Sequence, residues 1–428
     1  MKCYITSIIM IEMSEFLTLH NPWWRQNTYI PSESALPRRQ DYSRLWDLTV
    51  QTKQVVSITG LRRIGKTTMM RQMIADLLKT VHPKRILFVS FDQPIIETLP
   101  ETITSILKWY GSEILAEKFP YVSDQTYIFF DEIQQIPQWQ DMLKRYYDLT
   151  DKVKFVVSGS SSAFLRPAGR ESLAGRVFDV TVHPLSYTEF LRLSPSKTFD
   201  DYLRFGQFPE LLNFPSNETK VQYLRDSIIA KVLDIDIPTI VRIRNKQQLD
   251  RLFWTFMPNV GQIVNFPKLI RELGMSSSTF YKYLHVLSDS LLVHQVVNGS
   301  GSFRSEKRLL RKIYPSSSNF LSLYSPVPSM GFFAETYVAE MLLQTFHGVQ
   351  LWYDRGKEVD FYLPDKHIAI EIKYQDTIHA DDVANLNYLG KKRKNIRKIL
   401  IVKKDFTSIV KDVEMVPIDE FEETIKKW

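Results

Sequence analysis

The chain has 428 residues, of which 44% are hydrophobic and 24% are charged, and its formal net charge is +7. This composition is typical of a globular protein and excludes a disordered chain, and the length predicts about two to four domains. The basic balance is compatible with a nucleic-acid partner. A single cysteine, Cys3, excludes an internal disulfide and a cysteine-based metal cluster. No apolar run reaches the roughly 18 residues of a membrane span, so we expect a cytoplasmic protein without a membrane partner.

Residues 1–43 are predicted to be an N-terminal arm that leads into the first domain. The arm is polar and marked by prolines, and it contains the pair Trp23 and Trp24. We expect this pair to pack on the core, with stacking on a base or on a neighbouring subunit as the alternative. Met13 is a second candidate start for the chain, which would make residues 1–12 an extension.

A glycine-rich motif follows the first predicted strand. Residues 54–59 predict a strand, residues 60–68 fit the pattern G-x-x-x-x-G-K-[ST], and residues 69–78 predict a helix. In this context the backbone N–H groups of the loop and the helix N-terminus face the phosphates of a nucleotide. Lys66 is expected to reach the β- and γ-phosphates, and the Thr67 hydroxyl to bind Mg²⁺. The predicted ATP-binding residues are Gly60, Arg62, Arg63, Ile64, Gly65, Lys66, Thr67 and Thr68.

Two further predicted strands end in polar side chains. An apolar run over residues 126–130 ends in Asp131 and Glu132, as in a buried parallel strand whose carboxyl end carries ligand chemistry. Asp131 is expected to bind Mg²⁺, and Glu132 to orient and polarise the attacking water. The alternative is an ordinary strand that ends in an acidic turn. A strand near residue 154 ends in hydroxyls, so that either Ser158 or Ser160 senses the γ-phosphate or the serines only form a tight turn.

The pattern of elements divides the chain into further domains. Residues 44–193 alternate strands and helices, as in a parallel α/β sheet, and residues 194–245 predict a helical lid. Residues 246–313 predict two helices, a strand and a hairpin turn, which is the order of a winged helix-turn-helix. Purely protein contacts are the alternative use of such a module. Residues 314–330 predict a linker. The basic residues available for phosphate contact in this module are Lys282, Arg304, Lys307, Arg308, Arg311 and Lys312.

A second chemical constellation lies in residues 331–428. Residues 368–374 alternate strictly, so Glu371 and Lys373 share one face of a strand, and Asp360 lies on the neighbouring hairpin strand. An upstream helix offers Glu335. Carboxylates with a lysine are the groups needed for metal-dependent phosphodiester hydrolysis, with Asp360 and Glu371 as Mg²⁺ ligands. The spacing resembles the PD-(D/E)xK nuclease core, and the alternatives are a core that only binds or an exposed charged hairpin.

As a whole, the chain resembles the archaeal and bacterial AAA+-type ATPases that join a P-loop core to a C-terminal nuclease-like domain of unknown function. Segments that carry this resemblance are residues 60–68, 129–133, 158–162, 173–176, 184–190, 206–210, 358–360 and 371–373. The family often has two glycines before Phe-Pro-Glu, and Gln207 replaces the second one here.

The resemblance implies a P-loop AAA+ core with a parallel sheet, a helical lid, a winged helix-turn-helix and an α/β restriction-endonuclease-like domain. It also implies ATP binding and a homo-oligomer, with a hexamer as the candidate arrangement. By the same likeness Arg176 is the candidate arginine near the γ-phosphate, either in its own chain or at a neighbour's nucleotide, with Arg166 and Arg170 as rivals. A surface arginine that caps a helix is the alternative.

These patterns together predict a cytoplasmic Mg²⁺-dependent ATPase whose client is DNA. A nucleotide-switched signalling ATPase that binds proteins and an ATP-gated endonuclease are the two alternatives.

Overall fold

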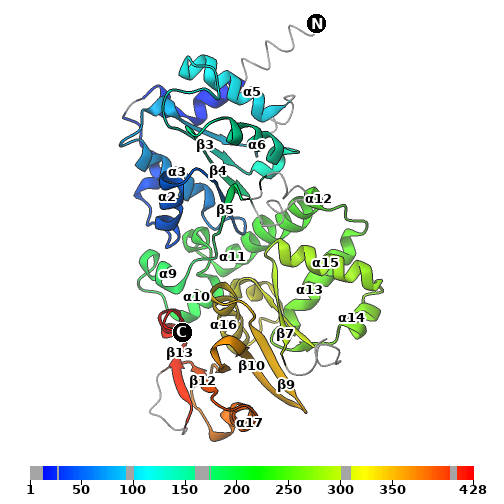
Figure 1. Ribbon diagram of the computed structural model, residues 1–428. Helices are drawn as coiled ribbons and strands as arrows, with labels where there is room; N and C mark the ends of the chain where they lie inside the picture. Colours follow the sequence, from blue (N-terminus) through cyan, green and yellow to red (C-terminus); the bar gives the residue numbers. More distant parts are fainter. Residues whose placement is uncertain are drawn as a thin grey trace. The chain divides into compact units, whose positions relative to one another are not determined.

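The computed structural model describes residues 13–26, 28–92, 101–159, 173, 175–299, 310–404 and 412–428. The chain divides into two compact units, Met1–His183 and Pro184–Trp428 (Figure 1). Both units mix helices with strands, and the first contains a parallel sheet, so the predicted α/β fold class is confirmed. None of the helices within the described ranges has the length and apolar character needed to cross a membrane.

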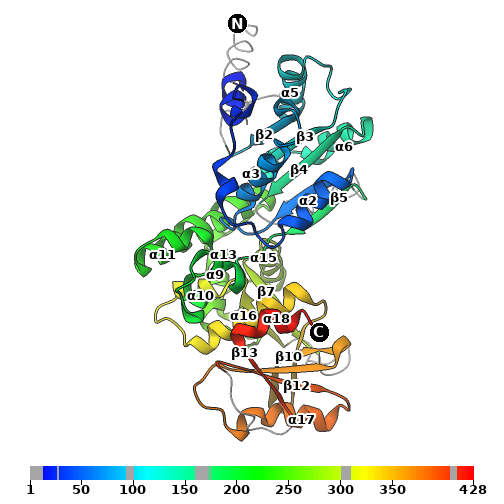
Figure 2. The ribbon, with the colours of Figure 1, turned by 90° about the vertical axis from the view of Figure 1, so that its left-hand side faces the viewer.

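The described part of the first unit is built on a five-stranded parallel sheet in the order β2-β3-β4-β1-β5 (Figure 2). Every residue of β1, β3 and β4 is buried, which means that both faces of these strands are covered. The strands are β1 (Val55–Thr59), β2 (Ile86–Ser90), β3 (Thr126–Asp131), β4 (Val153–Gly159) and β5 (Val177–Thr181). The α-helices are α2 (Tyr42–Gln51), α3 (Lys66–Leu77), α5 (Thr102–Trp109) and α6 (Trp139–Leu149).

The strand order determines which residues meet at the edge of this sheet. Strand β4 lies between β1 and β3 and pairs in parallel with both. The carboxyl ends of these three strands therefore lie side by side, because parallel strands run in the same direction. The loop after β1, the acids at the end of β3 and Ser158 near the end of β4 are thus brought together at one edge.

The described part of the N-terminal arm packs along the edge strand β2. The ring nitrogens of Trp23 and Trp24 donate to the Ile86 carbonyl at 3.0 and 2.8 Å. The Asn21 side chain donates to the Phe88 carbonyl at 2.9 Å and accepts from the Phe88 N–H at 2.6 Å. These contacts agree with the expectation that the tryptophans pack on the core, and they satisfy backbone groups that an edge strand leaves unpaired.

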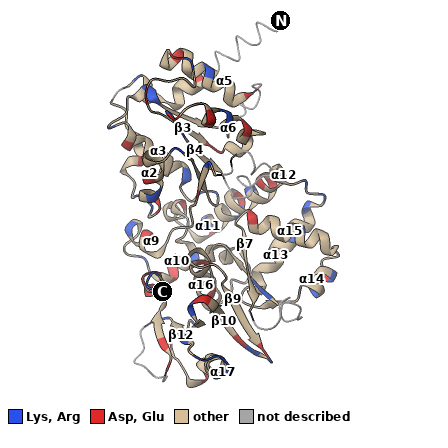
Figure 3. Ribbon diagram, in the orientation of Figure 1, with Lys and Arg blue, Asp and Glu red and all other residues tan. Residues whose placement is uncertain are grey.

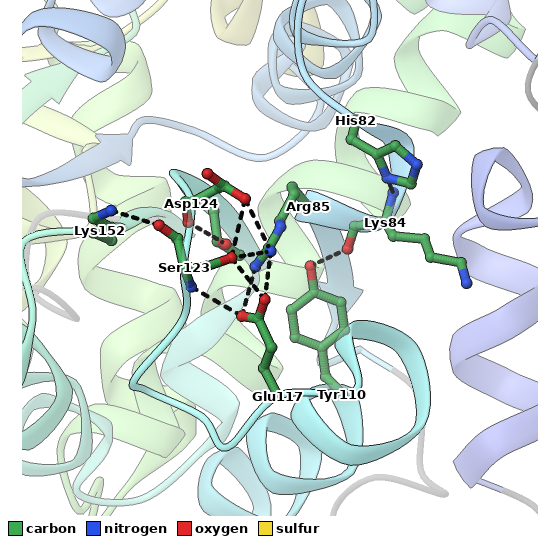
Figure 4. Close-up of polar contacts among 9 residues, drawn as sticks. His82, Lys84, Arg85, Tyr110, Glu117, Ser123, Asp124 and Lys152 are labelled. Carbon is green, nitrogen blue, oxygen red and sulfur yellow. Dashed lines mark hydrogen bonds and ion pairs between the residues drawn. The ribbon is translucent and has the colours of Figure 1, made fainter.

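A polar cluster stabilises the opposite, amino edge of the sheet (Figure 4). Arg85, directly before β2, forms a two-pronged contact with the Glu117 carboxylate at 2.6 and 2.9 Å. It also donates to Ser123 at 2.8 Å and pairs with Asp124 at 3.2 Å. The Arg85 hydrogen bonds lower the pKa of Glu117 to about 2. This cluster is a structural contact far along the strands from the phosphate-binding loop.

In its described part the second unit contains an eight-stranded sheet in the order β13-β12-β11-β10-β9-β7-β8-β6. The strands are β6 (Ile263–Val264), β7 (Val293–Asn298), β8 (Arg311–Pro315), β9 (Gln350–Asp354), β10 (Lys357–Leu363), β11 (Ile368–Lys373), β12 (Arg397–Val402) and β13 (Glu414–Pro417). The first helices are α9 (Tyr187–Leu193), α10 (Phe199–Phe205), α11 (Asn217–Tyr223), α12 (Ile237–Ile240) and α13 (Lys246–Phe256). They are followed by α14 (Phe266–Glu272), α15 (Ser277–Asp289), α16 (Met330–Thr345), α17 (Ala384–Lys392) and α18 (Phe421–Ile425).

Residues 246–313 and 331–428 share this one sheet, although the sequence predicts separate winged-helix and nuclease-like domains. Strand β7 from the first region pairs in parallel with β9 from the second, through Val297 and Gln350. Helices α14 and α15 and the strands β7 and β8 follow one another in the predicted order. The parallel pairing joins residues about 50 positions apart, and no local pattern signals such a contact.

The predicted linker over residues 314–330 is wrong for its first half. Ser317, Ser318 and Asn319 are fully buried. The Gln207 side-chain oxygen accepts from Ser317 at 2.6 Å and from Ser318 at 3.2 Å, and the Gln207 N–H donates to Asn319 at 2.9 Å. The serines that resemble a solvated linker instead satisfy a buried amide, which explains why a polar stretch lies in the core.

Gln207 also donates to Glu340 of α16 at 2.7 Å, and burial raises the pKa of Glu340 to about 8. Because the folded pKa lies above the usual 4.5, the folded state binds the proton more tightly, and stability falls as pH rises from about 4.5 through 8. We expect Glu340→Gln to be more stable than the wild type at pH 9, by up to roughly 5 kcal/mol. The gain should be small at pH 5. Thermal unfolding of both proteins at pH 5 and pH 9 measures this difference in stability.

The exposed Glu420 provides the control for this pH dependence, since Glu420→Gln removes a carboxylate of the same unit outside the core. That variant should unfold like the wild type at both pH values. Equal unfolding midpoints of Glu340→Gln and the wild type at pH 9 would contradict the assignment.

Candidate active site

The backbone of the phosphate-binding loop adopts conformations that need glycine. Gly60 has φ +145°, and a Cβ there would lie 2.3 Å from the Val182 carbonyl oxygen and 2.4 Å from Ile64. Gly65 has φ +99° and directly precedes α3. Arg63 also has a left-handed backbone, with φ 65°. Successive left-handed and glycine positions turn backbone N–H groups toward the helix N-terminus, the arrangement that holds an anion.

Lys66 points back into this loop. Only 5% of its surface is exposed, and its ammonium donates to the carbonyls of Gly60 at 3.0 Å and Leu61 at 2.9 Å. The guanidinium of Arg39 donates to the Ile64 carbonyl at 2.5 Å, which fixes the loop from the side of the N-terminal arm. Arg39 is a contact that the sequence pattern does not signal. The other predicted loop residues, Arg62, Ile64 and Thr68, lie in the loop and the first turn of α3.

Asp131, at the end of β3, connects the loop helix α3 to the neighbouring strand β4. Its carboxylate accepts from the Thr67 hydroxyl at 2.7 Å and, on the other oxygen, from the Ser158 hydroxyl. The side chain is 3% exposed, and burial raises the pKa of Asp131, with the nearby Glu132 charge acting in the same direction. A hydroxyl and a carboxylate side by side are hard oxygen ligands and fit Mg²⁺, which takes few protein ligands beside substrate phosphates. The structure thus brings Thr67, Asp131 and Ser158 into one group, whereas the sequence left open whether Ser158 has a role here or only forms a tight turn.

Glu132 follows directly in a left-handed conformation, with φ 53°. Its N–H donates to the Ser158 hydroxyl at 3.2 Å, and its carboxylate accepts from the Gln134 side-chain amide. A non-glycine residue held in this region is strained, and such strain gathers at functional sites. Gln134 was not predicted from the sequence, and it fixes the carboxylate that is expected to polarise water.

Arg176 lies away from this group. It directly precedes β5, and Val177 pairs with Val55 at the amino end of β1, whereas the phosphate-binding loop leaves the carboxyl end of β1. Its guanidinium donates to Asp148 at 2.9 Å. The predicted role in its own chain is therefore wrong, because the two ends of a strand lie a full strand length apart. The rivals Arg166 and Arg170 and the alternative Ser160 lie outside the described residues.

In the second unit, two of the predicted nuclease-like residues meet around a lysine. The Lys312 ammonium of β8 lies 2.9 Å from Glu335 of α16, 2.6 Å from Glu358 and 3.0 Å from Asp360 of β10. Tyr314 donates to Glu335 at 2.7 Å. Burial lowers the pKa of Lys312, but the three carboxylates outweigh burial and raise it well above its usual value. Lys312 is thus a charged, buried group and not the phosphate contact predicted from the sequence.

Glu371 and Lys373 form a pair on β11. The carboxylate accepts from the Lys373 ammonium at 2.8 Å, and burial raises the pKa of Glu371 to about 8. Ile370 and Ile372 pack in the core cluster that contains residues of α16, so the alternating Glu371 and Lys373 lie on the other face of the strand. Within the described residues, no group of three or more His, Cys, Asp and Glu side chains is arranged to hold a metal ion.

The remaining basic residues predicted for DNA contact are only partly available. Lys282 of α15 is exposed and donates to the Arg242 carbonyl at 3.2 Å. Arg311 donates to Gln295 at 2.7 Å and lies over the Phe266 ring. The other predicted contacts, Arg304, Lys307 and Arg308, lie outside the described residues.

Comparison with known proteins matches three parts of the chain to families. Residues 52–191 match the family described as an AAA domain. Residues 196–316 and 330–421 match two families that are each described as a domain of unknown function. A relative from Haemophilus influenzae named "Uncharacterized protein" is 23% identical over 396 residues, which cover 86% of this chain and 94% of the relative. A second relative with such a name, from Mycobacterium tuberculosis, is 26% identical over 359 residues, covering 80% and 75%.

Among solved structures, a Walker-type ATPase of Pyrococcus abyssi is similar at 13% identity and a TM-score of 0.42, covering 68% of this chain and 96% of that one. The Orc1 protein of Aeropyrum pernix, solved in complex with DNA, is similar at 14% identity and a TM-score of 0.32, covering 75% and 98%. Both scores are below 0.5, so these likenesses carry no argument about function. The match over residues 52–191 and the phosphate-binding loop within it identify this part of the chain as an AAA-type P-loop ATPase domain.

Proposed function

We propose that this protein is a Mg²⁺-dependent ATPase that couples ATP binding and hydrolysis to the binding or remodelling of DNA. The observation that carries the proposal is the hydrogen-bonded group of Thr67, Asp131 and Ser158 directly beside the glycine-rich loop. These side chains come from α3, β3 and β4, which are separate in the sequence. An ordinary acidic turn at the surface would not require them to converge.

Each residue of this group has a distinct task in the proposed reaction. The loop N–H groups and Lys66 bind the phosphates, and Thr67 and Asp131 hold Mg²⁺, which when bound neutralises charge during phosphoryl transfer. Ser158 contacts both Asp131 and the Glu132 N–H, and in this proposal it reports on the γ-phosphate to both acids. Glu132 orients the attacking water, and Gln134 positions its carboxylate.

Oligomer formation belongs to the same proposal. An arginine that completes an ATPase site can come from a neighbouring subunit. Arg176 lies at the amino edge of its own sheet and is 31% exposed, so it serves a neighbour's nucleotide if it serves any. A homo-oligomer, with a hexamer as the candidate arrangement, is therefore expected under this function.

A basic segment at the end of α17 supports DNA as the client. Residues 391–398 contain six Lys and Arg side chains (Figure 3). Arg397 pairs with Glu414 and Lys392 with Asp354. Lys391 and Lys394 are exposed, and neither has a partner among the residues that the structure describes. A concentration of exposed cations on one segment is the electrostatic feature that phosphate backbones recognise.

We expect Lys391→Glu with Lys394→Glu to weaken the binding of duplex DNA by about tenfold or more. The slope of log affinity against log salt should also become shallower by about two, because each lost phosphate contact removes nearly one released counterion. Fluorescence anisotropy of labelled duplex DNA at increasing KCl concentrations measures both quantities.

Lys108→Glu with Lys118→Glu is the matched control, since it makes the same change in charge at two exposed lysines of the first unit. This control should retain most of the affinity. An equal loss of DNA affinity in both double variants would show a general effect of net charge. The α17 segment would then not be the DNA contact.

A nucleotide-switched ATPase that binds proteins is the second candidate, and one observation favours it. The exposed face of α15, the helix that would enter DNA in a helix-turn-helix, carries Lys282 but also Tyr281 and the His285–Asp289 pair. This face is only weakly basic and suits a protein contact better than a phosphate backbone. DNA binding that is absent at low salt would favour this second function.

A further inference from the structure

The centre of the carboxylate cluster in the second unit is filled by the chain itself. An ammonium has three N–H donors, and the Lys312 ammonium has three carboxylates within 3.0 Å, from Glu335, Glu358 and Asp360. The number of donors thus equals the number of acidic partners. The oxygens that face the centre of the cluster are already engaged by a cation.

The remaining oxygens of two of these acids are also engaged or enclosed. The second Asp360 oxygen accepts from the Ile372 N–H at 3.0 Å. The second Glu335 oxygen lies against Gly261, so closely that a Cβ added to this glycine would be 2.5 Å from the oxygen. A divalent ion would need carboxylate oxygens at about 2.0–2.6 Å, and the ammonium occupies the place from which it could reach them.

We propose that Lys312 is the resident cation of this cluster and takes the position of a divalent metal, so that the C-terminal region binds its partner without metal-dependent cleavage. This inference does not depend on the ATPase function. Glu371, the other predicted metal ligand, is paired with Lys373 through one oxygen, and its other oxygen is buried without a partner among the described residues.

The geometry of β8 holds Lys312 in place. Lys312 pairs with Ile263 of β6 on one side and with Val296 of β7 on the other, and its side chain is 1% exposed. Removal of the ammonium would leave three partly buried carboxylates close together without a cation, which is unfavourable. A metal therefore cannot displace Lys312 by a simple rotation of an exposed side chain.

The first test counts Mn²⁺ ions bound to the full chain by isothermal titration calorimetry without nucleotide. The absence of nucleotide makes the result independent of ATP hydrolysis. We expect the wild type and Asp360→Asn to bind the same number of ions. If Asp360→Asn binds one ion fewer than the wild type, the cluster is a metal site as it stands and the proposal is overturned.

The second test removes the ammonium and keeps an unbranched side chain that is one atom shorter. Lys312→Met is expected to bind one Mn²⁺ more than the wild type, and Mn²⁺ should raise its unfolding temperature. The extra ion should be lost in Lys312→Met with Asp360→Asn. Lys154→Met is the control, because Lys154 is also buried but donates to backbone carbonyls such as those of Leu48 and Thr52, so Mn²⁺ should not stabilise it.

A folded Lys312→Met variant that gains no Mn²⁺ site would contradict the proposal. If this variant does not fold, the comparison of the wild type with Asp360→Asn still decides. Incubation of wild-type protein with duplex DNA and Mn²⁺ gives a further readout, for which we expect intact DNA, and cleavage that Asp360→Asn abolishes would overturn the proposal.

Discussion

Glu132→Gln is expected to bind ATP with nearly wild-type affinity and to hydrolyse it at least about 100-fold more slowly. The carboxylate of Glu132 lies beside the Asp131 group but takes no part in its hydrogen bonds to Thr67 and Ser158, so nucleotide binding should survive. The amide that replaces it cannot polarise a water molecule, and loss of a positioned general base typically costs 10²- to 10⁴-fold. Binding of a fluorescent ATP analogue and release of phosphate measure the two effects separately.

Asp151→Asn is the matched control for this substitution. Asp151 is exposed, lies in the same unit and pairs with Lys53 alone among the residues that the structure describes, so conversion to an amide should leave hydrolysis unchanged. Hydrolysis by Glu132→Gln at the wild-type rate would show that another group positions the water. Loss of binding together with hydrolysis would instead place Glu132 among the nucleotide ligands.

Lys66→Ala is expected to weaken ATP binding by about 10- to 100-fold and to reduce hydrolysis to the background rate. The Lys66 ammonium lies inside the loop, on the carbonyls of Gly60 and Leu61, so the variant loses a charge at the point where phosphates would bind. A charge-assisted hydrogen bond contributes about 1.5–3 kcal/mol, which corresponds to this range of affinity. Equilibrium binding and steady-state hydrolysis both report it.

Lys79→Ala is the control for the loss of a lysine, because Lys79 follows the C-terminal end of α3, away from the loop, and is 70% exposed. We expect this control to bind and hydrolyse ATP like the wild type. Retention of full ATP affinity by Lys66→Ala would mean that the loop does not hold the phosphates.

The ATPase site could be predicted from the sequence because its signals are local. The glycines, Lys66 and Thr67 are contiguous, and Asp131 and Glu132 directly end an apolar strand. The rule that parallel strands bring their carboxyl ends to one edge then places these segments together without knowledge of any long-range contact. The same rule brings Ser158 to this edge, but the sequence does not separate Ser158 from Ser160 or from a serine turn without a role.

Most of the contacts that sequence analysis missed depend on pairing between distant segments, although the Gln134–Glu132 contact is local. Lys312 resembles a surface cation next to other basic residues, but β8 joins a sheet that brings it to carboxylates from α16 and β10. The predicted linker is polar because Ser317 and Asn319 satisfy Gln207, more than 100 positions away. Arg176 was assigned to the site from a motif alone, and its position at the amino end of β5 follows only from the strand register.

The central claim is that ATP hydrolysis at the P-loop is coupled to DNA. Its most direct test is the steady-state ATPase rate of the wild type without DNA and with single-stranded, duplex or branched DNA, against Lys66→Ala under the same conditions. We predict a rate that depends on Lys66 and rises several-fold with at least one form of DNA. A Lys66-dependent rate that no form of DNA changes would contradict the coupling and favour the protein-binding switch.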